Sequence, residues 1–169
     1  GLPYPGGVLL DRLAQKGTAD ARLFPRPYAH VDNLDFSFSG LKTAALTYLN
    51  EHPALVEEGR RIREAGTDSA SPALCDVCAS YMLAVAETLS LKMEKAFYRE
   101  RQKGIAGIVV AGGVAANTQV RAAMHALARK VGKPLLLPSR FLCTDNAVMI
   151  AHAGELLACK GYGQRSEEH

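Results

Sequence analysis

Two uninterrupted apolar segments in the second half of the chain constrain its fold more than any other feature. Residues 107–111 (GIVVA) and 134–137 (PLLL) carry no polar side chain. Such runs are typical of strands buried on both faces, as in parallel sheets covered by helices. Each is followed by apolar residues at helical spacing, over 112–131 and 143–161. We therefore expect an α/β fold that ends in a β-α-β-α unit.

The longest helix that the sequence predicts covers residues 72–101. Ser71 can accept a backbone hydrogen bond as its N-cap, and Pro72 suits its first turn. Seven residues recur at helical spacing and define a core face: Leu74, Cys78, Tyr81, Val85, Leu89, Met93 and Phe97. A helix of this length braces a domain, so we expect a helix-rich lobe.

Shorter elements are expected elsewhere. Helical spacing indicates helices at 9–16 and 41–50, and alternating aromatic and polar residues over 34–40 (LDFSFSG) predict a short strand. Residues 51–71 are polar, so we expect an exposed excursion, in part helical. Its RRIRE cluster can contact phosphate, although a solvated surface is the commoner role of such clusters. A disordered tail is expected at 162–169.

Composition limits the classes of protein to which the chain can belong. It has 169 residues, of which 48% are hydrophobic and 22% charged, as in ordinary globular domains. A net charge of +3 does not by itself indicate a nucleic-acid partner. No uninterrupted apolar stretch approaches the ~18 residues of a membrane span. With no secretory signal in view, a reducing cytoplasm is the expected location.

The four cysteines include one C-x-x-C pair, Cys75 and Cys78. A zinc site needs further ligands at matching spacing, and Cys143 and Cys159 are not so placed. The pair also lies inside the long helical pattern, where small buried thiols are common core residues. Packing is therefore the favoured role, with zinc or redox chemistry as the alternative.

A Gly-Gly pair ends the first apolar segment, and Asn117 follows four residues later. Ligands of parallel sheets bind at the carboxyl ends of the strands, and Gly112 and Gly113 lack the Cβ that would keep a ligand away from the backbone. The helix that follows points its free N–H groups to the same place. Asn117, about one turn into that helix, offers an amide that can bind hydroxyls or a base edge. Tight strand–helix packing explains the same residues equally well.

The second candidate site is the CTDN segment, residues 143–146, which follows the second apolar segment and so lies at the same sheet edge. Thr144 can cap the next helix, and an Asp in its first turn interacts favourably with the helix dipole. Alternatively, Asp145 presents its carboxylate to a metal or to a cation bound by phosphate. Spacing alone leaves both interpretations open.

Four blocks, in this order, resemble the bacterial TsaD family: GLPYPGG, LDFSFSGLKTA, VVAGGVAAN and CTDNAVMIA. Related archaeal and eukaryotic proteins are the Kae proteins, once described as O-sialoglycoprotein endopeptidases or glycoproteases. The resemblance covers residues 1 to about 160. It implies an actin-like ATPase fold, with two ribonuclease-H-like lobes around a cleft. It also implies transfer of a threonylcarbamoyl group from threonylcarbamoyl-adenylate to N6 of the adenosine beside the anticodon of tRNA, within a complex of several subunits.

The resemblance assigns a nucleotide-binding role to five positions. Gly7 and Asp11 match positions at the ribose side of the nucleotide. Asn117 matches an asparagine that holds the adenylate, which would lie against the backbone of Gly112 and Gly113.

The resemblance also implies one divalent metal ion, iron or zinc, with Asp145 as a ligand. The other ligands, two histidines of an H-x-x-x-H motif, and an S-G-G-H-T loop belong to the upstream part of the family's sequence. We therefore expect this chain to be one C-terminal lobe, residues 1–169, of a longer protein whose N-terminal lobe is missing. On its own it should be inactive, hold no identifiable catalytic residue and self-associate through bare apolar surface. The alternatives are a non-catalytic partner or scaffold subunit of the same complex and, less favoured, a metallo-endopeptidase.

Overall fold

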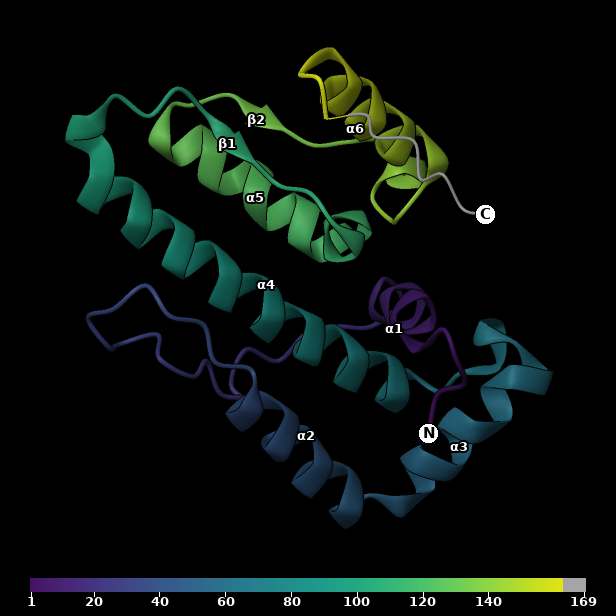
Figure 1. Ribbon diagram of the computed structural model, residues 1–169. Helices are drawn as coiled ribbons and strands as arrows, with labels where there is room; N and C mark the ends of the chain where they lie inside the picture. Colours follow the sequence, from purple (N-terminus) through teal and green to yellow (C-terminus); the bar gives the residue numbers. More distant parts are fainter. Residues whose placement is uncertain (163–169) are drawn as a thin grey trace, which may run out of the picture.

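The longest helix, α4 (Pro72–Glu100), runs through the middle of the protein, and a computed structural model, which describes residues 1–162, arranges the other elements around it (Figure 1). The Ser71 hydroxyl caps α4 by accepting a hydrogen bond from the Leu74 N–H (3.2 Å), and Pro72 occupies its first turn. Both features stabilise a helix start. The prediction of one long helix from residue 72 is confirmed.

Three helices precede α4: α1 (Gly6–Ala14), α2 (Ser39–Glu51) and α3 (Pro53–Ala65). A short 3₁₀ turn, η1 (Thr67–Ser69), leads into α4. Residues 51–71, the expected excursion, are mostly exposed, but Ile62 of α3 is buried in the core. The tail expected at 162–169 lies, apart from Tyr162, outside the described residues.

The second half of the chain forms the expected β-α-β-α order. Its elements are η2 (Arg101–Lys103), β1 (Ile108–Val109), η3 (Gly113–Ala116), α5 (Thr118–Val131), β2 (Leu135–Leu136), η4 (Arg140–Leu142) and α6 (Ala147–Cys159). The strands pair in parallel, with Ile108 opposite Leu135, and the Ile108 N–H donates to the Pro134 carbonyl (2.9 Å). Each strand has only two residues, fewer than predicted, but the parallel crossover through α5 is confirmed.

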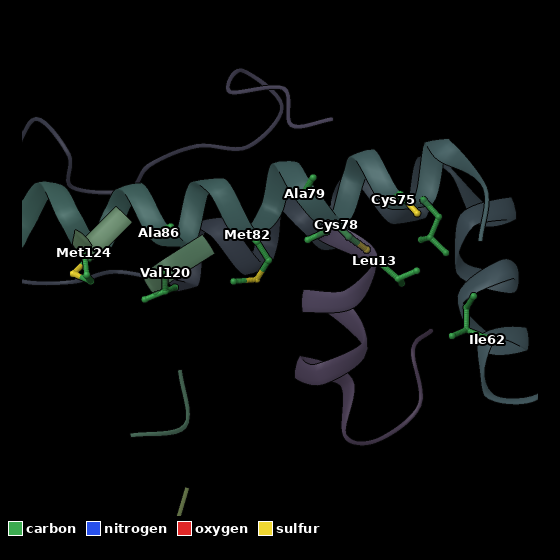
Figure 2. Close-up of a cluster of buried hydrophobic side chains, with 11 residues drawn as sticks. Leu13, Ile62, Cys75, Cys78, Ala79, Met82, Ala86, Val120 and Met124 are labelled. Atoms are coloured by element: carbon green, nitrogen blue, oxygen red, sulfur yellow. The ribbon is translucent and has the colours of Figure 1, made fainter. Parts of the chain in front are cut away.

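The main core lies where α1, α3 and α5 pack against α4. Figure 2 shows Leu13 of α1, Ile62 of α3 and Val120 of α5 around the buried face of α4. The α4–η2 stretch, Pro72–Lys103, contains a window with the length and the hydropathy, 1.4, of a membrane span, but half of that window is buried inside the protein. Core helices of soluble proteins have the same property, so composition alone does not make α4 a membrane helix.

Two expectations about the strands are wrong. Residues 34–38 form no strand, and α2 begins at Ser39 and includes Gly40. The alternating Phe36 and Phe38 instead stack their rings on each other, with centroids 6.3 Å apart. A period-two pattern produces a strand only where a neighbouring strand accepts its hydrogen bonds, and none of the described residues provides one here.

The sheet is also not buried on both faces. Ile108 is 7% exposed, whereas Val109 is 68% and Leu136 61% exposed. The helix α5 lies against one face only, and every residue of α6 is exposed, including its apolar Val148, Ile150 and Leu157. In the described part of the chain, the outer sheet face and α6 therefore form a bare apolar surface.

Candidate functional site

The glycine pair forms a tight turn between β1 and α5. Gly112 has φ +89° and ψ 171°, a conformation that is essentially restricted to glycine, and its carbonyl accepts from the Ala115 N–H (2.9 Å). Gly113 has no such constraint. A Cβ added at Gly113 or Gly7 would meet no heavy atom within 4 Å, so both glycines border open space.

Asn117 is the N-cap of α5, not a residue one turn inside the helix as predicted. Its Oδ1 accepts from the Val120 N–H (3.0 Å), and its Nδ2 donates to Oδ1 of Asp11 (2.8 Å). The amide thus uses one donor and one acceptor within the protein and keeps one Nδ2 hydrogen and one lone pair.

Asp11, from α1, is bound to the start of α5. Its Oδ1 also accepts from the Thr118 N–H (3.0 Å), and its Oδ2 accepts from the Thr118 hydroxyl (3.0 Å) and, at 3.3 Å, from Nε2 of Gln15. A carboxylate at a helix N-terminus is favoured by the helix dipole. The prediction that the start of α5 offers free N–H groups to a ligand is therefore wrong for Thr118, whose N–H is taken by Asp11.

Thr118 was not predicted as part of the site. Its partner Asp11 lies 107 residues earlier in the chain, so no local pattern links the two. The only local signal in the sequence is its position directly after Asn117.

A hollow of about 660 Å³ opens beside this network, between α1, α4 and the glycine turn. Four of the six predicted site residues line it: Gly7, Asp11, Gly113 and Asn117. Its volume is in the range of small-molecule sites. Its apolar wall is formed by Val8, Leu10, Met82, Val85 and Val114, and its cations are Arg12 and Arg140. The lining therefore combines an apolar wall with polar and charged side chains.

Asp145 does not line this hollow. It is exposed and precedes Asn146, whose Oδ1 caps α6 by accepting from the Met149 N–H (3.1 Å). The predictions of Thr144 as the cap and of Asp145 in the first turn are therefore wrong by two residues. Within residues 1–162, no three His, Cys, Asp or Glu side chains are grouped to hold a metal. One carboxylate does not make a transition-metal site, because such sites use about three protein ligands.

Arg121 joins the two candidate segments. One guanidinium nitrogen donates to the Ala115 carbonyl in η3 (2.8 Å), and another donates to the Pro138 carbonyl after β2 (3.1 Å). The same side chain therefore fixes the glycine turn and the segment that leads to Asp145 relative to each other.

The C-x-x-C pair is part of the core. Cys75 and Cys78 are buried free thiols on α4, and burial raises the pKa of Cys78 to about 12 and also raises the pKa of Cys75. A thiol with a raised pKa is a poor nucleophile and metal ligand at neutral pH. The packing role is confirmed.

Comparison with known proteins gives consistent matches over nearly the whole chain. The family model described as "TsaD: tRNA N6-adenosine threonylcarbamoyltransferase" matches residues 1–152. A protein of that name from Lawsonia intracellularis is 57% identical over 166 residues, which are 98% of this chain and 46% of the relative. Its namesake from Nitratidesulfovibrio vulgaris strain DP4 is 52% identical over 157 residues, 92% of this chain and 44% of the relative. The chain thus spans just under half the length of these relatives.

Proposed function

The chain belongs to the TsaD family of tRNA N6-adenosine threonylcarbamoyltransferases, and we propose that the protein containing it modifies tRNA in the cytoplasm. The reaction is transfer of a threonylcarbamoyl group from threonylcarbamoyl-adenylate to N6 of the adenosine beside the anticodon. The observation that carries the proposal is the hollow in which Gly7, Asp11, Gly113 and Asn117 meet. These positions come from two segments more than 100 residues apart in the chain, and the resemblance assigned all four to the nucleotide.

In this proposal, Asp11 and Asn117 hold the sugar of the adenylate. The weakest contact of the Asp11 carboxylate is the exposed one with Gln15, at 3.3 Å. A ribose hydroxyl can replace Gln15 there without disturbing the bonds to α5. The remaining Nδ2 hydrogen of Asn117 is available to a second hydroxyl.

The base and the phosphate of the adenylate then lie in different parts of the hollow. The base lies against the apolar wall near Val114 and Met82. The phosphate lies away from Asp11, because a second anion beside that carboxylate would be repelled. Arg12 and Arg140 are the cations in the lining of the hollow that can pair with it.

We place Asp145 outside this pocket, as one ligand of a divalent metal, iron or zinc, whose other ligands come from outside this chain. In the full-length protein, Asp145→Asn should then lose both bound metal and transferase activity, because an amide lacks the full charge of the carboxylate. Metal content and product formation would be measured on the same preparation. A metal-replete, active Asp145→Asn protein would contradict this assignment.

The same proposal identifies the partners as tRNA, further subunits of the threonylcarbamoylation complex and an N-terminal lobe. We place that lobe on the bare apolar surface of α6 and the sheet. Without it, the 169-residue chain should self-associate, since exposed apolar surface and unpaired strand edges invite pairing. A single monomeric species in light scattering at high protein concentration would count against this placement.

The activity is tested by incubating the full-length protein with tRNA, threonylcarbamoyl-adenylate and its partner enzymes, and by measuring threonylcarbamoyladenosine in the digested tRNA by mass spectrometry. Asp11→Ala and Asn117→Ala should lose most product. Gln15→Ala is the matched control and should keep it, because the ribose displaces Gln15. The 169-residue chain alone should form none. Absence of product with the wild-type full-length protein would refute the proposed function.

A further inference from the structure

The positive charge of the chain is concentrated at one end of the molecule. Residues 92–103 and 129–133, at the ends of α4 and α5, carry eight of the 20 Lys and Arg residues: Lys92, Lys95, Arg99, Arg101, Lys103, Arg129, Lys130 and Lys133. The same two ranges contain only two acidic residues, Glu94 and Glu100. A net charge of +3 for the whole chain therefore conceals a strongly basic end.

Part of this end surrounds a hollow of about 1020 Å³. Leu91, Glu94, Lys95, Tyr98 and Arg99 line it from α4, and their three- and four-residue spacing places them on one face of that helix. The lining is completed by Arg101 of η2, Lys130 of α5, and Ala29 and Asp32 of the loop before α2. We call Lys95, Tyr98, Arg99, Arg101 and Lys130 the basic patch.

Two of the four cations in the basic patch remain uncompensated. Lys95 pairs with Asp32 (2.8 Å) and Lys130 with Glu94 (2.6 Å). The hydrogen bond and charge of Lys95, with a contribution from Arg99, hold the pKa of Asp32 below its usual range, so this carboxylate stays ionised at neutral pH. Arg99 and Arg101 are exposed, and neither forms an ion pair with any residue in the described part of the chain. The hollow thus has an excess of positive charge.

The basic patch also presents an aromatic ring. Tyr98 is 45% exposed beside Arg99, and its ring forms a T-shaped pair with the ring of Phe97. Surfaces that bind single-stranded nucleic acid combine a positive groove along the backbone with aromatic side chains on which bases stack. The hollow has both features, because it contains unpaired guanidinium groups and one exposed tyrosine.

We propose that the basic patch binds the sugar–phosphate backbone of the tRNA substrate. The choice of tRNA rests on the proposed function. Arg99 lies 14 residues beyond Val85 on α4, and Val85 lines the hollow at Asp11, so at 1.5 Å per residue the two sites are about 21 Å apart along the helix. The patch therefore contacts a part of the RNA that is distant from the adenosine being modified, and contributes affinity rather than chemistry.

The test is tRNA binding by the full-length protein, followed by fluorescence anisotropy over a range of salt concentrations. The double variant Arg99→Glu/Arg101→Glu should weaken binding at least tenfold. It should also lower the slope of log Kd against log salt by about 1.4 to 1.8, the value for two lost phosphate contacts. At saturating tRNA, the rate of modification should be unchanged, so the loss appears in KM.

The matched control is Arg60→Glu/Arg61→Glu on α3, which changes the net charge equally but lies beside the opposite end of α4 (Figure 1). It should change Kd less than threefold. Equal weakening by both double variants would show a general electrostatic effect and overturn the proposal. The neutral variant Arg99→Gln/Arg101→Gln should give a smaller loss than the Glu variant, and its binding tests the same surface if the Glu variant does not fold.

Failure of the patch and failure of the proposed function are distinguishable. A wild-type protein that modifies tRNA, together with patch variants that bind it normally, would overturn only the basic patch. A wild-type protein that neither binds nor modifies tRNA would overturn both.

Discussion

The starts of α5 and α6 occupy equivalent places in the fold but differ in their tertiary contacts. Each follows a strand of the same parallel pair, and each is capped by an asparagine, Asn117 or Asn146, that accepts the N–H three residues later. At α5, the carboxylate of Asp11 arrives from α1 and closes the network. At α6, Asp145 is exposed, and no hydrogen bond joins it to another described residue. Local cap chemistry is thus the same, and tertiary contacts decide which carboxylate belongs to the fold.

The largest expected difference in unfolding free energy is between substitutions of one methionine on each helix. Met124 of α5 is 1% exposed, whereas Met149 of α6 is 50% exposed. Met124→Ala leaves a cavity against α4 and should lower the free energy of unfolding by about 2–5 kcal/mol. Met149→Ala in the same chain should lower it by less than about 0.5 kcal/mol. Chemical denaturation of the two variants measures both values, and equal losses would show that α6 is packed.

Substitution of the two aspartates, Asp11 and Asp145, should produce a smaller difference in stability. Asp11→Ala removes the acceptor of three hydrogen bonds from the half-buried Asn117 and Thr118, so we expect a loss of about 1–3 kcal/mol. Asp145→Ala removes no contact and only a weak interaction with the α6 dipole, so its loss should stay below about 1 kcal/mol. Thermal unfolding at neutral pH compares them. A loss for Asp145→Ala as large as that for Asp11→Ala would mean that Asp145 has a structural partner.

The smallest difference in stability is expected between substitutions of the two N-cap asparagines. Asn117→Ala and Asn146→Ala each remove one N-cap hydrogen bond, which typically costs about 1 kcal/mol. Asn117→Ala should cost a few tenths of a kcal/mol more, because it also removes the bond to Asp11. If Asn146→Ala were the more damaging substitution, the contrast between α5 and α6 would be wrong.

Several features of the fold could be predicted because they depend on neighbouring residues. Apolar runs at 107–111 and 134–137 with a helix between them have few arrangements other than a parallel crossover. Ser71, Pro72 and the apolar spacing of the next residues are sufficient to define α4. The prediction of a strand at 34–40 was wrong because a strand also needs a neighbouring strand that accepts its hydrogen bonds. The prediction that both sheet faces are buried was wrong because the described residues cover only one face of the sheet.

The candidate site could be predicted only in part, because some of its contacts join residues that are distant in the sequence. Gly112, Gly113 and Asn117 are adjacent in sequence, so their clustering follows from one turn. The contacts of Asp11 with Asn117 and Thr118 span more than 100 residues, and the resemblance, rather than any spacing, placed Asp11 beside the turn. Neither the family resemblance nor a sequence motif identifies Thr118 as a site residue. Its role follows from the packing of α1 and α5 on α4.

Binding of AMP to Gly113→Ala in the full-length protein tests most directly whether the hollow at Asp11 receives an adenine nucleotide. The added Cβ meets no protein atom within 4 Å and needs no left-handed backbone, so the free energy of unfolding should change by less than about 0.5 kcal/mol. Gly112→Ala is the contrasting variant, because its φ of +89° makes any side chain strained by about 1–3 kcal/mol. We expect calorimetry to show AMP affinity reduced at least tenfold for Gly113→Ala, since the methyl group occupies the space of the ligand. Wild-type affinity in a fully stable Gly113→Ala protein would show that the nucleotide does not bind in this hollow.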